Sequence, residues 1–415
     1  MKIKPLLLGM LYLMPAIYST TSHAAALDQS GQSILAFLED KNYFEANMTV
    51  ADPEVSGKIR NNRPDLVNST DLNTGDMAKS FQYYNAALKL QIAPQISFGL
   101  IYDQPFGADV AYPLRSNNTF YDNEISMQGT TVDVSSQNIN MLLGFQPDPR
   151  FNLYAGAVYQ TVKGEISLRG NSMSIFNGYD ANFKEDSSVG WLAGAAFQIP
   201  EIALKAAVTY RSEIKHQMDV NETIFGQALE LTSASSTDIT TPQSVNIDFQ
   251  TGVYKDTIAY LNARWVNWKD FVIRPTQFGA LTEMATAEMS QGSYTGGFNL
   301  DDHQKDQWSA TLGLGHQWSE KWSTSADVSW DSGTGNPASV LNPTEGGWGV
   351  GLGMQYNPTP SYFIAAGVKY FWIGDAVAQD GTYHVPVPGA AEMAEHADFN
   401  DNNVIGYGLK IGYRF

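Results

Sequence analysis

The chain of 415 residues contains no cysteine, and beyond its N-terminal segment it has no apolar run long enough to cross a membrane as a helix. A spanning helix needs roughly 20 consecutive apolar residues, so a membrane location would require strands instead. The absence of cysteine excludes a small fold held together by disulfides. No linker rich in proline, glycine or serine divides the chain, and this continuity predicts one large domain.

Basic residues are also scarce, since 25 lysines and arginines stand against 43 acidic residues and the formal net charge is −18. This balance argues against nucleic acid or anionic lipid as a partner, because both would be repelled. No recognisable nucleophile motif accompanies any histidine. We therefore expect a protein that is not an enzyme and has no cofactor. The acidic stretch from Glu392 to Asp401 either forms a solvated loop or binds a divalent cation.

The N-terminus has the layout of a secretory signal peptide. Lys2 and Lys4 precede an apolar run from Pro5 to Tyr18, and small residues follow at Ala24 and Ala26. Because the run is shorter than a spanning helix, we predict a signal peptide over residues 1–26, cleaved after Ala24 or Ala26. An N-terminal membrane anchor is the alternative.

Almost the whole remaining chain alternates between apolar and polar residues with a period of two, which indicates β-strands. Several apolar rows carry aromatic rings at their ends. A soluble β-sandwich has no reason for this placement, whereas the two water interfaces of a bilayer attract amphipathic rings. The sequence therefore predicts an all-β transmembrane barrel over residues 43–415, with Trp308, Trp318, Trp330, Tyr362 and Trp372 at the lipid interfaces.

Fourteen antiparallel strands can be counted from this pattern. Short connections such as Pro94-Gln95 alternate strictly with long ones, which is typical of periplasmic turns and extracellular loops. An even strand number places both termini on the periplasmic side. The last strand ends in Phe415 and resembles the signal read by the outer-membrane assembly machinery. The predicted strands begin near Tyr43, Asn85, Ile96, Thr131, Phe151, Ser187, Ile202, Gln243, Ile258, Asp306, Trp322, Gly347, Tyr362 and Asn403.

Residues 27–42 precede the first strand and are expected to form a short plug in the lumen. Their apolar residues Ile34, Leu35, Phe37 and Leu38 would suit a helical turn docked against the wall. A loosely tethered periplasmic tail is the alternative.

The lumen is predicted to contain cations as well as glycines that leave room for a plug or a ligand. Lys205, Arg211 and Lys215 share the face opposite an apolar row, so all three are expected to point inward.

Several segments resemble the long-chain fatty acid transporter family of outer-membrane proteins, the FadL/TodX type. The similarity follows the same order along nearly the whole chain after the signal peptide. The resemblance implies a monomeric barrel of fourteen strands with an N-terminal hatch, which passes hydrophobic molecules by diffusion. The segments concerned are Ala207–Lys215, Tyr154–Ile166, Ala263–Phe271, Lys305–Trp318 and Asp103–Gly107.

The last of these segments interrupts the third strand. Proline removes a ladder donor and glycine leaves a gap, so Pro105 and Gly107 would break the pairing with a neighbouring strand. In the family, the third strand kinks inward and the ligand leaves sideways into the membrane. The resemblance assigns this lateral gate to Gln104, Pro105, Phe106 and Gly107. A strand that simply ends at Pro105 is the alternative.

The resemblance also implies an apolar pocket with basic residues for a carboxylate, and it assigns ligand binding to Lys305, Arg211, Phe106 and Ile166. The type member has an arginine where this chain has Ile166, and Arg169 is the nearest base. This departure leaves room for neutral hydrocarbons or aromatics.

We therefore expect passive uptake of long-chain fatty acids or similar hydrophobic molecules across the bacterial outer membrane. An importer of neutral aromatic hydrocarbons is one alternative. A general porin for small polar solutes is another, although a porin should carry a ladder of opposed lumen charges, and the predicted mid-height lumen is poor in charge. The predicted partners are the hydrophobic ligand, outer-membrane lipid and lipopolysaccharide, and the assembly machinery.

Overall fold

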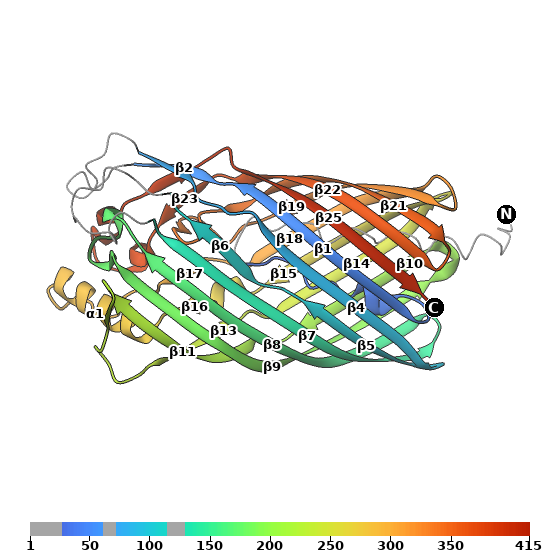
Figure 1. Cartoon of the computed structure of the whole chain (residues 1–415), viewed down its shortest axis with the longest axis horizontal. Helices are drawn as coiled ribbons and strands as arrows, with labels where there is room; N and C mark the ends of the chain where they lie inside the picture. The colour runs from blue at the N-terminus through green and yellow to red at the C-terminus, as the bar shows by residue number, and fades with distance from the viewer. Residues whose placement is uncertain (1–26, 61–71, 114–128) are drawn as a thin grey trace.

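The computed structural model describes residues 27–60, 72–113 and 129–415. The predicted signal peptide and parts of the loops near Pro64 and Asn117 lie outside these residues. The prediction of a closed barrel with fourteen antiparallel strands is confirmed. The first strand pairs with both the second and the last strand, so the sheet has no free edge. The C-terminus lies at the end with short turns, and the longer loops and helix α1 lie at the opposite end (Figure 1).

Each wall strand is a neighbour of the next one along the chain, as in an up-and-down barrel. All fourteen predicted strand starts fall within or close to observed strands. The wall strands are β1 (Tyr43–Glu54), β4 (Phe81–Ala93), β5 (Ile96–Asp103), β7 (Thr131–Asp148), β8 (Phe151–Leu168), β9 (Tyr179–Ile199), β10 (Leu204–Arg211), β14 (Ser244–Tyr254), β15 (Thr257–Val266), β18 (Gln307–Gln317), β19 (Trp322–Asp331), β21 (Glu345–Thr359), β22 (Tyr362–Gly374) and β25 (Asn403–Arg414).

Three wall strands are broken along their length and continue as separate segments. The third strand continues from β5 into β6 (Gly107–Ala111), the seventh from β10 into β11 (Ile214–Ile224), and β13 (Ser236–Thr241) leads into β14. A short strand β12 (Gln227–Ala228) folds back on the end of β11.

Smaller elements surround the extracellular end. Strands β16 (Val272–Ile273) and β17 (Asp301–Asp302) form one pair. A further sheet contains β20 (Ala338–Ser339), β23 (Ala376–Gln379), β24 (Ala397–Phe399), β2 (Ser56–Ile59) and β3 (Asn73–Asp76). The helices at this end are α1 (Thr276–Met289), α2 (Ala390–Met393) and the 3₁₀ turns η4 (Asn171–Phe176), η6 (Trp268–Asp270) and η7 (Gly381–His384), whereas η2 (Leu35–Leu38) precedes β1 and η5 (Pro200–Ile202) forms the short turn between β9 and β10. Among the described residues, no helix is long and apolar enough to span a bilayer.

Aromatic and aliphatic side chains cover the outside of the wall. Trp308, Trp318, Trp330 and Trp372 are exposed there, at the two ends of apolar rows. Tyr362 is half-buried at the start of β22. Because these rings are not in a dry protein core, the outer face is the one that suits lipid.

The alternation of faces reverses inside the seventh strand. Lys205 and Arg211 are buried in the lumen as predicted, but the prediction for Lys215 is wrong. Its side chain is 66% exposed and forms an ion pair with Asp238 at 2.7 Å. Between β10 and β11 the chain leaves strand geometry at Ser212 and Glu213, and a shift of one residue turns every following side chain to the other face.

The segment before β1 runs inside the barrel. Ile34, Phe37 and Leu38 are buried against wall residues, and the Phe37 ring meets Tyr154 edge-on at 5.8 Å. A Cβ added to Gly99 would lie 2.3 Å from the Phe37 ring. Glycine on the wall thus makes the close approach of this segment possible.

Candidate functional site

An apolar cavity lies in the outer part of the lumen. It contains about 510 Å³ of atom-free space, part of it open to solvent, and its surface is apolar. Residues from six wall strands, the third to the eighth, contribute, together with Leu27 from the N-terminal segment. The larger side chains around it are Phe106, Ile166, Phe183, Met218, Trp268 and Phe271.

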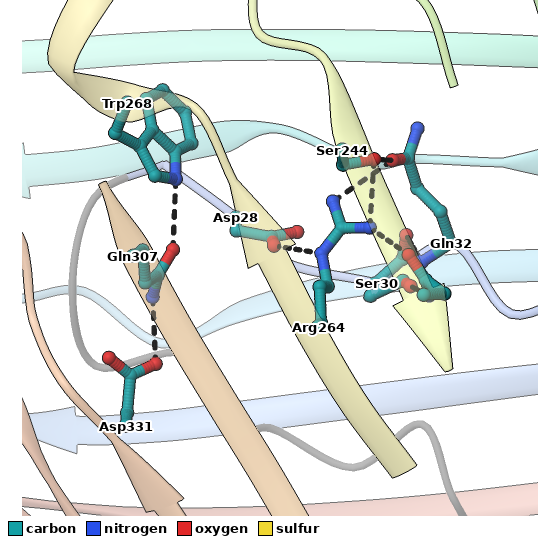
Figure 2. Close-up of polar contacts among 10 residues, drawn as sticks. Asp28, Ser30, Gln32, Ser244, Arg264, Trp268, Gln307 and Asp331 are labelled. Atoms are coloured by element: carbon teal, nitrogen blue, oxygen red, sulfur yellow. Dashed lines mark hydrogen bonds and ion pairs between the residues drawn. The ribbon is translucent and has the colours of Figure 1, made fainter. Parts of the chain in front are cut away.

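Trp268 is the largest fully buried side chain around the cavity. Its ring meets Phe106 edge-on at 5.6 Å, and its indole Nε1 donates to Gln307 Oε1 at 2.8 Å. Gln307 Nε2 in turn donates to Asp331 Oδ2 at 2.7 Å (Figure 2). The indole nitrogen is therefore satisfied behind the ring, which leaves the apolar ring beside the cavity.

The third strand breaks where Phe106 enters this cavity. Its pairing with β7 ends at Asp103 opposite Asn138 and resumes at Gly107 opposite Ser135. Three residues of the third strand, 104–106, thus oppose two residues of β7, which is the count of a β-bulge. Phe106 is buried. We call residues 104–106 the third-strand break.

The same break separates the third strand from β4. Pairing between β4 and β5 ends at Ala86 opposite Tyr102, and among the described residues β6 has no ladder with β4. The next backbone donor on β4, Tyr84 N, is satisfied instead by Gln104 Oε1 at 2.7 Å.

The N-terminal segment closes the third-strand break from inside. Gln29 N donates to Pro105 O at 2.7 Å, and Gly107 N donates to Leu27 O at 2.9 Å. Asp28 and Phe106 therefore form an isolated antiparallel bridge. The backbone groups freed by the break find their partners in the plug, as buried backbone groups must.

Arg264 on β15 holds this segment in position. Its Nε donates to Asp28 Oδ2 at 2.7 Å and its Nη2 donates to Gln32 Oε1 at 2.9 Å. Its Nη1 donates to Ser244 at 3.2 Å (Figure 2) and to Asn246 at 2.7 Å. The Asp28 and Arg264 side chains are 1% and 6% exposed, so the ion pair is fully buried.

A second cavity lies on the other side of the Asp28–Phe106 bridge. It contains about 700 Å³ of atom-free space, including its open mouth, and has a mixed polar and apolar lining. Asp28, Gln29 and Gly107 line it, whereas Leu27 and Phe106 line the first cavity. The bridge between plug and third strand therefore forms the partition between the two spaces.

The predicted ligand residues fall in different places. Phe106 and Ile166 line the apolar cavity. Arg211 is buried in the wall, and within the described structure its Nε and Nη1 make no hydrogen bond. Lys305 is half-exposed at the extracellular end and lies 3.2 Å from Glu345. Neither cation lines either cavity, so their role with a carboxylate stays a prediction.

The predicted gate residues all belong to the third-strand break or border it. Pro105 and Gly107 bond to the plug, Gln104 bonds to β4, and Phe106 faces the cavity. Whether a ligand passes here stays a prediction. Arg264, Trp268 and Gln307 could not be predicted from the sequence, because their partners are distant along the chain and no local pattern marks them.

The strand pair β16–β17 covers the outer end of the apolar cavity through Ile273. Burial raises the pKa of Asp301 to about 7 and lowers the pKa of His303 to about 4. His303 stacks on Phe271, another lining residue, at 5.7 Å. In the part of the chain that the structure describes, no cluster of acidic, histidine or cysteine side chains could hold a metal ion.

Comparison with known proteins agrees with this architecture. The sequence profile of the outer membrane protein transport protein family (OMPP1/FadL/TodX) matches residues 28–415. No curated protein matches the chain. Among solved structures, a Pseudomonas aeruginosa FadL homologue is 14% identical, with a TM-score of 0.63 over 90% of both chains. The P. putida toluene transporter TodX is 12% identical, with a TM-score of 0.58 over 92% of both chains. The CymD monoaromatic hydrocarbon channel is 10% identical, with a TM-score of 0.52 over 96% of this chain and 95% of that one.

Proposed function

Since the chain belongs to the OMPP1/FadL/TodX family of outer membrane transport proteins, we propose that it takes up small neutral hydrophobic molecules by passive diffusion through its apolar cavity. Members of this family are transport channels of the outer membrane for hydrophobic compounds, and they are not enzymes.

The observation that carries the proposal is the apolar surface of the cavity. Transfer from water to such a surface favours a ligand by about 0.8 kcal/mol per buried methylene. A carboxylate would instead lose its hydration at an apolar surface, since neither Arg211 nor Lys305 lines the cavity and Lys163, the lysine in its lining, is an exposed residue. TodX and CymD are described as channels for toluene and for monoaromatic hydrocarbons, respectively, which fits a neutral cargo.

A fatty acid is the second candidate, and the observation that favours it is Arg211. A buried guanidinium with two donors unused among the described residues is suited to a carboxylate. A fatty acid would have to place its chain in the apolar cavity and its head group toward the wall of β10.

The ligand is proposed to leave the barrel sideways, through the third-strand break. The break interrupts the pairing between β4 and the third strand, and the Leu27–Gln29 segment covers it from inside. An apolar ligand that left toward the periplasm would expose its methylenes to water, whereas a sideways path keeps them in contact with lipid.

Ile166 offers a sharp test of the substrate class. Ile166→Arg introduces a base into the cavity and Ile166→Gln introduces a neutral polar group. We expect both variants to lose naphthalene binding, and only Ile166→Arg to gain palmitate binding, measured by equilibrium binding to the purified protein. Tighter binding of palmitate than of naphthalene by the unmodified protein would overturn the neutral-cargo proposal. Large, steady conductance in a planar bilayer would indicate a porin instead.

A further inference from the structure

A second interruption of the wall lies between β9 and the seventh strand. Pairing between them ends at Arg211 opposite Leu192 and resumes at Val220 opposite Phe183. Both strands advance by nine residues between these pairs, so the register is the same above and below. Ser212 N donates to Trp191 O. Among the described residues, the two strands form no further backbone ladder between this bond and Val220. We call residues 186–190 and 214–218 the window.

The two strands cannot pair in the window because their pleats are out of phase. The seventh strand reverses its faces at Ser212 and Glu213, below the window. Strand β9 reverses its faces only above it, where Lys184 and Glu185 together oppose one residue of β8. Between the two reversals, an inward residue on one strand stands opposite an outward residue on the other.

Side chains close the window in place of the backbone. His216 Nδ1 lies 2.9 Å from Asp186 Oδ2 across the window, and His216 Nε2 lies 3.0 Å from Gln160 Oε1 on β8. Ile214 fills the lower part, since a Cβ on Gly190 would meet it at 2.6 Å. The remaining pair, Lys184 and Asp219, is 3.8 Å apart and exposed, so it contributes little.

The apolar cavity lies directly behind the window. Met218 belongs to the window, Phe183 is the first paired residue above it, and both line the cavity together with Phe106. The cavity therefore extends from the third-strand break on one side to the window on the other. A separation of His216 from Asp186 would connect it to the outer surface of the barrel.

The outer surface at the window is mostly polar. Trp191 and Tyr210 form a ring pair at 5.1 Å just below it, at the level where aromatic rings mark the membrane interface. Above them Val189 is an exposed apolar side chain, and the other outward side chains are exposed and hydrophilic, among them Glu185, Gln217 and Asp219. The window thus faces the aqueous, lipopolysaccharide side of the interface rather than the hydrocarbon.

We propose that the window is a lateral entrance through which hydrophobic molecules pass from the extracellular side of the interface into the apolar cavity, with the His216–Asp186 contact as its latch. This inference rests on the proposed function. It assigns the window to entrance and leaves the third-strand break as the way out, so that the ligand crosses the lumen from one break of the wall to the other.

The test uses a reversible cross-link, which the absence of native cysteine makes specific. The double variant Asp186→Cys/His216→Cys is folded and inserted in the reduced form and then linked with a short bifunctional thiol reagent that can be cleaved. Uptake of naphthalene into proteoliposomes is followed by fluorescence before linking, after linking and after cleavage. We expect loss of most of the uptake on linking and its return on cleavage.

The matched control is Ala196→Cys/Ala207→Cys, which joins the same two strands where their backbones already pair. Linking this pair should leave uptake unchanged. Equal uptake by the linked and the reduced window variant would overturn the entrance. If the unmodified protein takes up no naphthalene at all, the proposed function fails instead, so the two failures are distinguishable. Because the linked and reduced states come from one folded sample, a folding defect cannot imitate either result.

Discussion

The two interruptions of the wall are closed by different means. At the third-strand break, backbone hydrogen bonds from Gln29 and to Leu27 replace the missing ladder. At the window, the side chains of His216, Asp186 and Ile214 fill the space. The first closure depends on the plug, and therefore on Arg264, which is 6% exposed. The second depends on the wall alone.

This difference separates the two movements that transport would require. The third-strand break can open only if the Leu27–Gln29 segment moves, which disturbs the buried Asp28–Arg264 pair. The window can open by rotation of the His216 and Asp186 side chains, without displacement of a backbone segment. The four perturbations below act on one side of this comparison or on both.

The largest effect is expected for Arg264→Met. This change leaves the Asp28 carboxylate buried without its cation, and breaking a buried pair in this way costs about 3 to 5 kcal/mol. The amides of Gln29 and Gly107, which close the third-strand break, should exchange with deuterium much faster, and the amides of β11 should keep their protection. If the amides of β11 lost protection to the same extent, the two interruptions would not be closed independently of each other. Lys305→Met, which removes the half-exposed partner of Glu345, is the control, and it should change stability by less than about 1 kcal/mol.

The next effect is expected for Pro105→Val/Gly107→Val. Valine restores a backbone donor at position 105 and favours an extended strand at both positions. A Cβ at position 107 would also lie 2.7 Å from the Gln29 side-chain amide, which would have to turn away. We expect slower release of naphthalene into liposome lipid, with unchanged equilibrium binding and unchanged heat-dependent gel mobility. Normal release would contradict lateral exit and favour release toward the periplasm.

A smaller effect, limited to charged ligands, is expected for Arg211→Gln. If palmitate binds through its carboxylate, loss of the guanidinium should weaken its binding by about 1.5 to 3 kcal/mol, the range for a charge-assisted hydrogen bond. Naphthalene binding should not change. The matched variant Lys305→Gln should have little effect on either ligand, because Lys305 lies half-exposed beside Glu345. If both variants lost palmitate affinity equally, Arg211 and Lys305 would contribute equally to binding of the carboxylate.

The smallest effect concerns the strand pair β16–β17, which covers the outer end of the apolar cavity. This pair belongs to neither interruption of the wall. The folded-state pKa of Asp301, about 7, lies above its ordinary value, so the fold favours the protonated carboxyl. The stability that the protonated Asp301 carboxyl gives to the fold is fully present below pH ~4 and is lost as the pH rises through about 7. Burial lowers the pKa of His303, whose contribution is therefore lost only on acidification.

Proteolysis of the loop that carries β17 should accordingly be faster at pH 8 than at pH 6.5, and Asp301→Asn should remove this dependence. Uptake through the window and release at the third-strand break should respond alike, since both share the covered cavity. A pH effect on one path only would show that Asp301 acts on that break of the wall.

Most of the barrel could be predicted from the sequence because its determinants are local. The alternation of side chains along each strand, the aromatic rings at the ends of the apolar rows and the alternation of short and long connections each follow from a few neighbouring residues. The interruption at Pro105 and Gly107 was also visible, since proline and glycine act on their own backbone.

Residues whose role depends on a distant partner could not be found in this way. Arg264 meets Asp28 across 236 positions, and the Trp268 indole is satisfied by Gln307 across 39. Neither arginine nor tryptophan carries a local mark that distinguishes these positions from others on the same face. The error at Lys215 has a related cause, because the reversal at Ser212 and Glu213 contains no proline or glycine.

The sequence by itself thus determined the barrel, its strand number and its lipid face, because period-two alternation and turn chemistry operate within a few residues. Only the tertiary structure decided where the wall is closed by backbone and where by side chains. That outcome depends on the relative phase of β9 and β11, which are separate in sequence, and on a plug that enters the lumen from outside the sheet. Pleat phase is a property of two strands together, so no single stretch of the chain contains it.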